Sequence, residues 1–388
     1  MTLNMTNIPP LDLTQQYESI AEEINTRVQE VLSSGRYIGG SIVDEFEQQF
    51  ANYIDVSHCV SCNSGTDALF LALRAVNIGH GDEVITTPFT FFATAEVISA
   101  VGATPVFIDI DPQTFNLDIE QLQSAITEKT KAILPVHLFG QPVDMTRLMA
   151  IARSHNLIVI EDCAQATGAK WLGKKVGSFG DIGCFSFFPT KNLGAFGDGG
   201  ALTTNNSAIA AQVRMLKNHG QSAKYFYEQI GINSRMDTIQ AAILQVKLRY
   251  LDSWNEQRRD LADRYFEFMS GINAVVPPQE LAGSRCVWNQ YTIRLKSQDL
   301  EATVKSRFSD SLRNWIRIQL QKKGIGSTVY YPIPLHLQPV YKFLAFRQLP
   351  IVEQFCHQVL SLPMFPELST QQQEQVIFTL KDCLQELL

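Results

Sequence analysis

Short apolar segments alternate with amphipathic stretches between residues 58 and 203, and this alternation limits the fold more than any other feature. Continuous apolar strands separated by helices are typical of a parallel or mostly parallel sheet with both faces covered. We expect strands at residues 58–62, 83–86, 104–108, 132–136, 158–160, 183–187 and 200–203. We expect the intervening helices at residues 66–76, 90–101, 119–126 and 145–155. Ligands of such a sheet bind at the carboxyl ends of its strands.

Further elements flank this region. Apolar residues at steps of three and four predict helices at 16–32, through 43–53, and at 236–250. The composition shifts near 253–259, so we expect a large α/β domain over residues 13–252 and a smaller α+β domain over 253–388, with residues 1–12 packing nearby. In the smaller domain we expect strands at 290–295 and 327–331 and helices at 303–322 and 368–387.

The composition excludes several classes of partner. The chain has 388 residues, 45% of them apolar, and a formal net charge of -7, which suits a globular protein of two or more domains. Without a block of like charge, neither a nucleic acid nor a membrane surface is expected as a partner. No apolar run is long enough to span a bilayer, and the first residues do not resemble a secretory leader. We therefore expect a cytoplasmic protein.

The cysteines and the absence of common catalytic motifs narrow the range of possible functions. Seven scattered cysteines argue against a disulfide framework. Cys59 and Cys62 have the CxxC spacing, but no second ligand pair for zinc follows, so we expect two small residues in a buried strand, with a redox pair as the alternative. The chain has no GxGxxG after a strand, no GxxxxGK[ST], no HExxH and no GxSxG. No metal site is expected.

Lys191 is the strongest candidate for a reactive group. It lies in the apolar, proline-containing segment 186–193, and the glycine-rich run 194–200 follows. Partial burial disfavours the charged form of a lysine, lowers its pKa and makes its amine nucleophilic. Such an amine forms a Schiff base with an aldehyde, as pyridoxal phosphate (PLP) requires. A surface lysine beside a flexible loop is the alternative, and the order of candidate partners along the chain argues against it.

Asp162 and Gln165 are candidate partners of a cofactor ring. Asp162 ends the apolar strand expected at 158–160, so its carboxylate would face the crevice at the edge of the sheet. A carboxylate beside a pyridine nitrogen keeps that nitrogen protonated and makes the ring an electron sink. Gln165 could reach the phenolic oxygen of the ring. The alternative is a capping acid at a strand–loop junction.

Candidate phosphate and stacking residues come from two further segments. Ser64 is a plausible N-cap, and Gly65 and Thr66 open the first helical turn, where unpaired N–H groups favour an anion. An ordinary N-cap is the alternative, and Ser186 could also donate to a phosphate. Phe91 could stack on the ring, although three phenylalanines in residues 89–92 are equally well explained as core, and the pattern does not choose among them.

Together these segments resemble the DegT-type nucleotide-sugar aminotransferases, a branch of the fold type I PLP enzymes. The matching segments are residues 35–40, 64–69, 87–91, 136–141, 161–166, 186–193, 231–236 and 331–336. The resemblance implies the fold type I PLP-transferase architecture, PLP as cofactor, and transfer of an amino group from an amino acid, by analogy glutamate, to a nucleotide-linked keto-sugar. The amino-acid sequences of segments 64–69 and 287–291 are closer to those of relatives that act at C3 of the sugar.

The resemblance also implies roles for single residues. Lys191 would be the PLP lysine, Asp162 the partner of the pyridine nitrogen and Gln165 its neighbour at the phenolic oxygen. The phosphate would be held by Gly65, Thr66 and Ser186, and Phe91 would stack on the ring. Asn233 would reach the phosphate of the other subunit's cofactor, which makes the active unit a homodimer with shared sites. Tyr331 and His336 would help to line the sugar pocket.

Two positions refine the expected function. Many relatives carry histidine where this chain has Tyr227, which affects the expected sugar contacts but not the PLP chemistry. A dehydratase branch of the family replaces the lysine with histidine, whereas this chain keeps Lys191, so amino transfer is implied. The alternatives are an amino-acid aminotransferase of the same fold and a PLP-binding regulatory or sensor protein without turnover.

Overall fold

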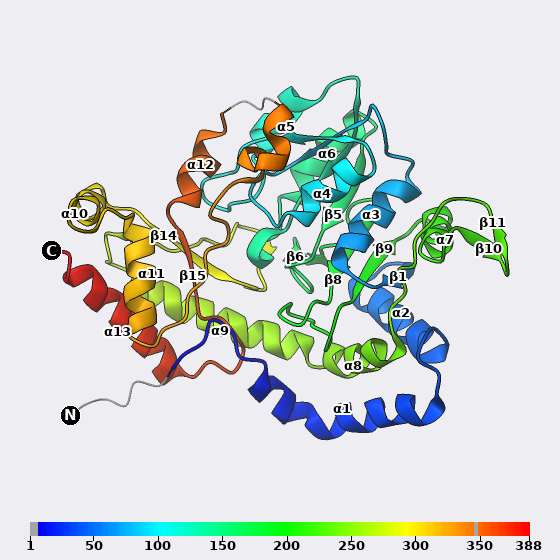
Figure 1. Cartoon of the computed structure of the whole chain (residues 1–388), viewed down its shortest axis with the longest axis horizontal. Coiled ribbons are helices and arrows are strands. Elements are labelled where there is room, and N and C mark those ends of the chain that lie inside the picture. Colours follow the sequence, from blue (N-terminus) through cyan, green and yellow to red (C-terminus); the bar gives the residue numbers. More distant parts are fainter. Residues whose placement is uncertain (1–6, 345–347) are drawn as a thin grey trace.

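The computed structural model describes residues 7–344 and 348–388, and in that part of the chain seven strands form one sheet (Figure 1). The order across the sheet is β1 (His58–Cys62), β9 (Gly200–Thr204), β8 (Ile182–Ser186), β5 (Ile158–Asp162), β4 (Thr130–Leu134), β2 (Glu83–Thr86) and β3 (Thr104–Phe107). Among these strands β9 runs antiparallel to both neighbours, and the other adjacent pairs are parallel. The predicted mostly parallel sheet is confirmed, and each strand lies within two residues of its expected position.

Helices cover both faces of this sheet, because consecutive strand residues point to opposite sides. Val84 packs with residues of α3 and α4, whereas its neighbour Ile85 packs with α6 on the other face. The helices around the sheet are α1 (Thr14–Ser34), α2 (Ser41–Ile54), α3 (Gly65–Ala75), α4 (Ala93–Ala100), α5 (Ile119–Ala125), α6 (Met145–Ser154), α7 (Ser207–Leu216) and α8 (Thr238–Leu248). A short 3-10 helix, η1 (Leu138–Gly140), follows β4.

The helix expected at 90–101 begins later, at Ala93. The loop before it satisfies part of its backbone locally, since the Thr87 hydroxyl accepts a hydrogen bond from the amide of Phe89. Such side-chain bonds offer the backbone an alternative to helix. As a result, the three residues before α4 form an irregular segment at the edge of the sheet rather than a helical turn.

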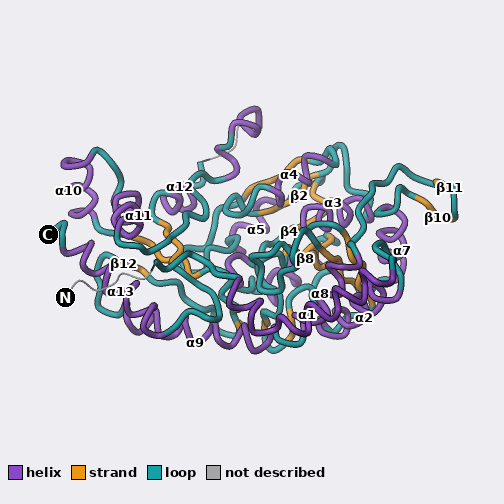
Figure 2. The backbone as a smooth tube through the Cα atoms, turned by 60° about the horizontal axis from the view of Figure 1, so that its bottom comes forward, coloured by secondary structure: helices purple, strands orange, loops and turns teal. Residues whose placement is uncertain are grey.

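The C-terminal part of the chain packs around a second core on α9 (Leu251–Met269). Its other elements are β12 (Val275–Val276), β14 (Tyr291–Leu295), α10 (Gln298–Phe308), α11 (Leu312–Lys322), η2 (Leu335–Leu337), η3 (Pro339–Leu344), α12 (Pro350–Cys356), β15 (Val359–Leu362) and α13 (Thr370–Gln385). Figure 2 shows α9 running along the molecule toward this part. The expected boundary at 252/253 falls in the first turn of α9, and the division into two domains stays a prediction.

Three short pairings complete the described structure. The hairpin of β10 (Gln221–Ala223) and β11 (Phe226–Tyr227) projects from one end of the molecule in Figures 1 and 2. The strands β6 (Lys170–Trp171), β7 (Lys174–Lys175) and β13 (Ser284–Arg285) form a small sheet. Ile8 bridges Ile325 and belongs to the C-terminal core, so residues 7–12 pack there, whereas residues 1–6 lie outside the described residues.

Two of the elements predicted for the C-terminal part differ from the structure, so these predictions are wrong. The helix expected at 303–322 is two helices, because Ser309 adopts the left-handed conformation with φ 54° and the Ser311 side chain caps α11. The strand expected at 327–331 is absent from the described structure, where Thr328 makes an isolated bridge to Ser361. Pro332 follows shortly after, and a proline lacks the N–H group that a ladder needs.

All seven cysteines lie in the described ranges, and all are free and buried, with Cys59 and Cys62 in β1. None of the helices in residues 7–344 and 348–388 combines the length and apolar character of a membrane-spanning segment.

The face of the sheet under α2 depends on aromatic packing around Phe50. Its ring packs edge-on against Phe185 and Phe187, at centroid distances of 5.0 and 5.2 Å. We expect Phe50→Ala to lower the free energy of unfolding by about 3–5 kcal/mol, because it opens a cavity in this cluster. Urea denaturation followed by circular dichroism measures the change. The control is Phe378→Ala in α13, where the ring is 70% exposed. Equal losses in the two variants would contradict this account of the core.

Candidate active site

A cavity of about 410 Å³ lies at the carboxyl edge of the large sheet, where the sequence places ligands. Its walls come from the start of α3, the segment before α4, the ends of β5 and β8, and the C-terminal part. The lining residues are Ser64, Gly65, Thr66, Leu69, Thr90, Phe91, Ala93, Thr94, Val136, Asp162, Ala164, Gln165, Ser186, Phe188, Thr190, Lys191, Asp198, Gly199, Gln290, Tyr330 and Tyr331.

Lys191 enters this cavity from the segment that follows β8. The segment turns back at once, since the amide of Lys191 donates to the carbonyl of Phe188 and the amide of Ala195 donates to that of Phe187. The Lys191 side chain is half-buried, and burial lowers its pKa to about 8, while the negative charge of Asp162 opposes the shift. A substantial fraction of this amine is therefore neutral and nucleophilic near physiological pH.

Asp162 ends β5 and faces the same cavity. Burial raises the pKa of its carboxyl group, and several groups counteract that effect. The amide of Ala164 donates to Oδ1 at 3.0 Å, the hydroxyl of Thr94 donates to Oδ2 at 2.9 Å, and the positive charge of Lys191 acts in the same direction. The carboxylate is thus held in one orientation, buried and opposite the amine.

The start of α3 presents backbone N–H groups to the cavity. Ser64 is the N-cap, as expected, and its hydroxyl accepts from the amide of Asp67. The amides of Gly65 and Thr66 have no hydrogen-bond partner in the described part of the chain, so they remain available to an anion. Gly65 also permits close approach, because a Cβ at that position would lie 2.6 Å from the Cβ of Ser186. Its small size is what brings the Ser186 hydroxyl beside these amides.

Phe91, Gln165 and Tyr331 line the remaining walls. Phe91 is 60% exposed at the cavity, whereas Phe89 is buried in the core, so of these two rings Phe91 is the one at the cavity wall. The Gln165 side chain accepts from the amide of Phe139 and donates to the Tyr331 hydroxyl at 3.1 Å. Its position is thereby fixed from two elements, and Tyr331 joins the C-terminal part to the site.

Two expected site residues do not line this cavity. Asn233 is exposed and lies outside the cavity of its own chain. His336 is buried, and its Nε2 lies 3.1 Å from the carboxylate of Glu353, which also accepts the amide of Leu349. This differs from the expectation that His336 lines a sugar pocket. The reason is that η2 directs its side chain toward α12.

Sequence reasoning missed Thr90, Thr94, Gln290 and Tyr330. All four line the cavity, and Thr94 bonds directly to Asp162. The helix expected at 90–101 held a signal for Thr94, because it placed Thr94 on the same helical face as the candidate Phe91, although α4 begins only at Ala93. No pattern around Gln290 or Tyr330 distinguished them from other residues of the C-terminal part.

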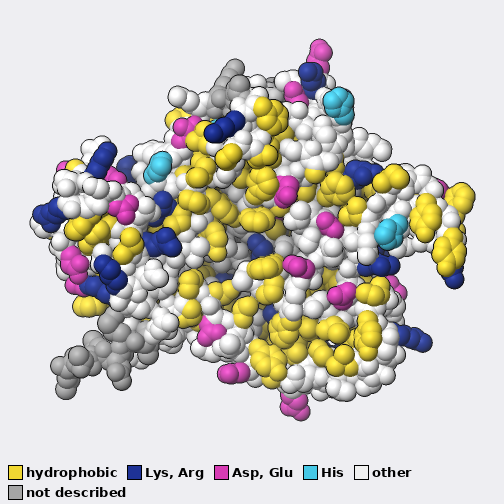
Figure 3. Space-filling model, in the orientation of Figure 1, with side chains coloured by type: hydrophobic (Ala, Val, Ile, Leu, Met, Phe, Trp, Pro, Cys, Tyr) yellow, Lys and Arg dark blue, Asp and Glu magenta, His cyan; other side chains and the backbone are white. Residues whose placement is uncertain are grey.

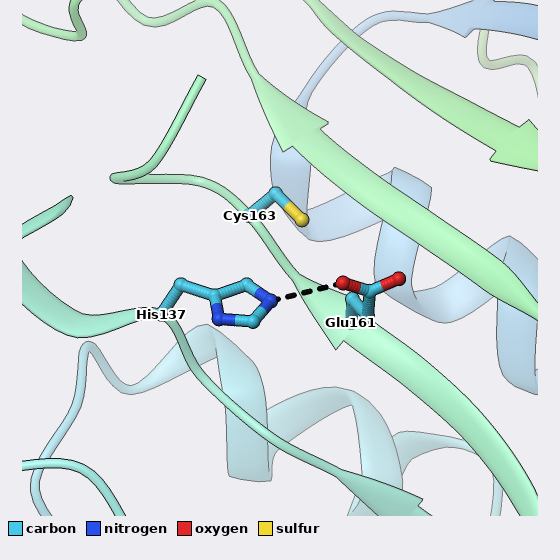
Figure 4. Close-up of side chains that lie close together, drawn as sticks. All are labelled: His137, Glu161 and Cys163. Carbon is cyan, nitrogen blue, oxygen red and sulfur yellow. Dashed lines mark hydrogen bonds and ion pairs between the residues drawn. The ribbon is translucent and has the colours of Figure 1, made fainter. Parts of the chain in front are cut away.

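The structure also brings together three buried side chains of types that can bind a metal ion, namely His137, Glu161 and Cys163 (Figure 4). The His137 ring is already used on both nitrogens, since Nδ1 accepts the amide of Val143 and Nε2 lies 3.1 Å from Glu161. The Glu161 carboxylate further accepts the amides of Gly177, Phe179 and Gly180. With their hydrogen bonds satisfied, these groups form a buried polar cluster that supports the end of β5.

The donor set of the cavity matches the groups of PLP. Unpaired amides at the α3 N-terminus suit a phosphate, a buried carboxylate suits a protonated pyridine nitrogen, and an amine of lowered pKa suits the aldehyde. Phe91 offers an aromatic face for the ring. These features share one cavity of about 410 Å³, so the residues present fit the cofactor.

Comparison with known proteins agrees with this geometry. Residues 18–381 match the model of the DegT/DnrJ/EryC1/StrS aminotransferase family, to which the chain belongs. The chain is 48% identical over 376 residues to a "Pleiotropic regulatory protein" of Geobacillus stearothermophilus, covering 96% of this chain and 97% of that protein. It is 45% identical over 372 residues to a UDP-N-acetyl-3-dehydro-alpha-D-glucosamine 3-aminotransferase of Acidithiobacillus ferrooxidans, covering 96% of each.

Solved structures resemble the whole chain as well. DesV of Streptomyces venezuelae superposes with a TM-score of 0.91 at 41% identity, covering 97% of this chain and 98% of that one. NtdA of Bacillus subtilis, solved with its cofactor PMP, gives 0.89 at 32% identity, covering 99% and 86%. The expected PLP-transferase fold is confirmed. The chain is a PLP-dependent aminotransferase of this family.

The pairing of Lys191 with Asp162 has a testable consequence for pH dependence. The Asp162 charge raises the pKa of Lys191, so Asp162→Asn should lower it below its value of about 8. In the apo protein, Lys191 should then react with an amine reagent at lower pH than in the wild type. Peptide mass spectrometry after brief acetylation across a pH series measures this, with the hairpin residue Lys224 as the internal control. An unchanged Lys191 profile would contradict the coupling.

Proposed function

We propose that this aminotransferase moves the amino group of glutamate to the C3 carbon of a nucleotide-linked 3-keto-sugar. The observation that carries the proposal is the single cavity in which Lys191, Asp162 and the α3 N-terminus meet. The C3 position is supported by segments 64–69 and 287–291, and by the 3-aminotransferase among the relatives above. Free, buried cysteines are typical of a reducing compartment, so we place the reaction in the cytoplasm.

When bound, PLP supplies a ring that withdraws electrons from the substrate carbon and so makes its proton acidic. Lys191 is proposed to move that proton. Its Nζ takes the proton from the α-carbon of glutamate in the first half-reaction. In the second half-reaction it delivers a proton to the sugar carbon that gains nitrogen. A pKa of about 8 suits both steps, because base and acid forms are both populated near neutral pH.

The other cavity residues are proposed to bind and orient. Asp162 holds the proton on the pyridine nitrogen, and Gln165 lies where it can reach the phenolic oxygen. The amides of Gly65 and Thr66 and the hydroxyl of Ser186 bind the phosphate. Phe91 stacks on the ring. Tyr331, fixed by its bond to Gln165, closes the cavity on the side of the C-terminal part and excludes water there.

We propose that the working unit is a homodimer with shared active sites. The hairpin β10–β11 carries exposed aromatic residues, with Tyr225 78%, Phe226 61% and Tyr227 57% accessible, and it forms an apolar patch at the edge of Figure 3. Arg74 ties the base of this hairpin to the body by donating to the carbonyl of Ile230 at 2.9 Å. An aromatic patch on a projecting segment favours contact with another protein surface.

The charge of the cavity supports the same proposal. Lys191 is the only lysine or arginine among the described lining residues, whereas Asp162 and Asp198 add negative charge. Glutamate and a nucleotide diphosphate are both anionic, so further positive charge is needed to hold them. The exposed segment with Asn233 also carries the exposed Arg235, and neither residue lines the cavity of its own chain. A second copy would bring these groups to the site.

A regulatory role is the alternative, because one relative is called a regulatory protein. A measurement of turnover distinguishes an aminotransferase from a regulatory protein. We expect the PLP-loaded protein with glutamate to aminate UDP- or dTDP-linked 3-keto-sugars, detected by mass spectrometry, and not simple keto acids. Lys191→Ala should abolish turnover, and borohydride reduction should label Lys191 in the wild type. PLP binding without amination of any keto-sugar would favour the regulator, and a label on another residue would contradict the role of Lys191.

The shared site predicts complementation between two inactive variants. Lys191→Ala should be inactive, and Asn233→Ala should lose activity about tenfold or more by weakening phosphate binding. A purified hybrid of the two chains has one intact site, which joins Lys191 of one chain to Asn233 of the other. It should recover about half of the wild-type activity per dimer. The matched control is a hybrid of Lys191→Ala with Asp162→Ala, whose defects fall in the same cavity. Equal inactivity of both hybrids would contradict the cross-subunit contact.

A further inference from the structure

Thr94 is the side chain that bonds to the buried carboxylate of the site. It lies in the first turn of α4, is 1% exposed, and donates its hydroxyl proton to Oδ2 of Asp162 at 2.9 Å. Oδ1 of the same carboxylate accepts the amide of Ala164 at 3.0 Å. Each carboxylate oxygen therefore has one donor from the protein, and Thr94 supplies the side-chain one.

The donation from Thr94 to Asp162 fixes the direction of a second hydrogen bond, between Thr94 and Thr90. A hydroxyl has one proton, and Thr94 gives its proton to the carboxylate, so its oxygen accepts from Thr90 at 3.1 Å. Both threonines and Asp162 are buried, with exposed fractions of 4% or less. The chain of donors thus runs from Thr90 through Thr94 to Asp162, and each bond polarises the next.

Burial alone would favour the neutral carboxyl group at this position, because it raises the pKa of Asp162. A neutral Asp162 could not keep a proton on a ring nitrogen. Donors to the ionised form oppose this effect, and a hydrogen bond to a charged group in a buried site is among the stronger ones in proteins. The Thr94 hydroxyl is therefore placed where it preserves the charge that the site needs.

Thr94 also connects two walls of the cavity. The amide of Thr94 donates to the carbonyl of Phe91 at 3.3 Å, so the residue is tied to the segment that presents the exposed ring. Its side chain is bonded to the end of β5. One residue thereby sets the position of the aromatic face relative to the carboxylate, and a flat ring bound between them must satisfy both.

We propose that Thr94 is a positioning residue that keeps Asp162 ionised and aligned with Phe91 for the cofactor ring. The inference rests on the proposed role of Asp162 at the ring nitrogen. Thr94 acts through Asp162 and does not itself touch the reacting atoms. Thr90 supports it by orienting its hydroxyl.

The test uses Thr94→Val, which keeps the shape of the side chain but removes the donor. The probe is PMP, whose binding does not involve a covalent bond to Lys191. We expect Thr94→Val to weaken PMP binding at least about tenfold at neutral pH. The affinity of Thr94→Val for PMP should fall further as the pH is lowered. This fall should begin at a higher pH than in the wild type, because the pKa of Asp162 rises further without its donor. Thr94→Ser, which keeps the hydroxyl, should restore binding to within about twofold.

A matched control is Thr86→Val in β2. Thr86 is also buried, and its hydroxyl donates to the carbonyl of Leu134 at 2.8 Å, away from Asp162. Thermal unfolding of the apo proteins compares the structural cost of the two valine variants. Equal weakening of PMP binding by Thr86→Val and Thr94→Val would overturn the proposal, as would a Thr94→Ser protein as weak as Thr94→Val.

A double variant separates this inference from the proposed function. If Thr94 acts through Asp162, Thr94→Val should add little to the loss caused by Asp162→Asn. Full additivity of the two losses would overturn the inference alone. If Asp162→Asn binds PMP as tightly as the wild type at every pH, the proposed role of Asp162 fails, and the role of Thr94 fails with it.

Discussion

A lysine amine and a carboxylate face each other across one cavity, and the rest of the structure keeps them there. Their strands, β5 and β8, are parallel neighbours, so both end at the same edge of the sheet. Asp162 is the last residue of β5, and Lys191 follows β8 in a segment that returns as the antiparallel strand β9. The chain turns back in the segment that contains Lys191 and does not enter a crossover helix. For this reason β9 runs antiparallel to β8 in a sheet whose other pairs, apart from β1–β9, are parallel.

The electrostatic layout of the cavity has a direction. Unpaired amides at the start of α3 make one end favourable for an anion, and the buried carboxylate of Asp162 makes the other end favourable for a cation. A cofactor with a phosphate and a protonated ring nitrogen has the same polarity. The opposite orientation would place the phosphate against the carboxylate, so the charges of the cavity favour the orientation proposed above.

The sequence predicted the sheet and its edge well, because apolar strands, glycine positions and strand ends are local features. It therefore pointed to Asp162, Lys191 and the α3 N-terminus, which the structure brings together at one cavity. It could not choose Phe91 over Phe89, because the direction of each ring depends on the irregular loop before α4. Thr94 was missed for the same reason, and the break at Ser309 depends on a single left-handed residue. The proposed role of Asn233 at the other subunit's site came only from the family resemblance, because no local pattern around this residue marks it.

The residues proposed to hold the cofactor and those proposed to lie near the sugar are on different kinds of segment. Asp162, Ser186 and Gly65 lie on strands and a helix start whose backbone positions are set by the core. Tyr330 and Tyr331 lie on the connection between α11 and η2, and such connections vary more readily than the sheet. Changes in those segments can alter which nucleotide and sugar are accepted while the distance between Lys191 and Asp162 stays the same. We therefore expect the loops of this chain to determine which substrate it accepts, and the sheet to position the residues that carry out amino transfer.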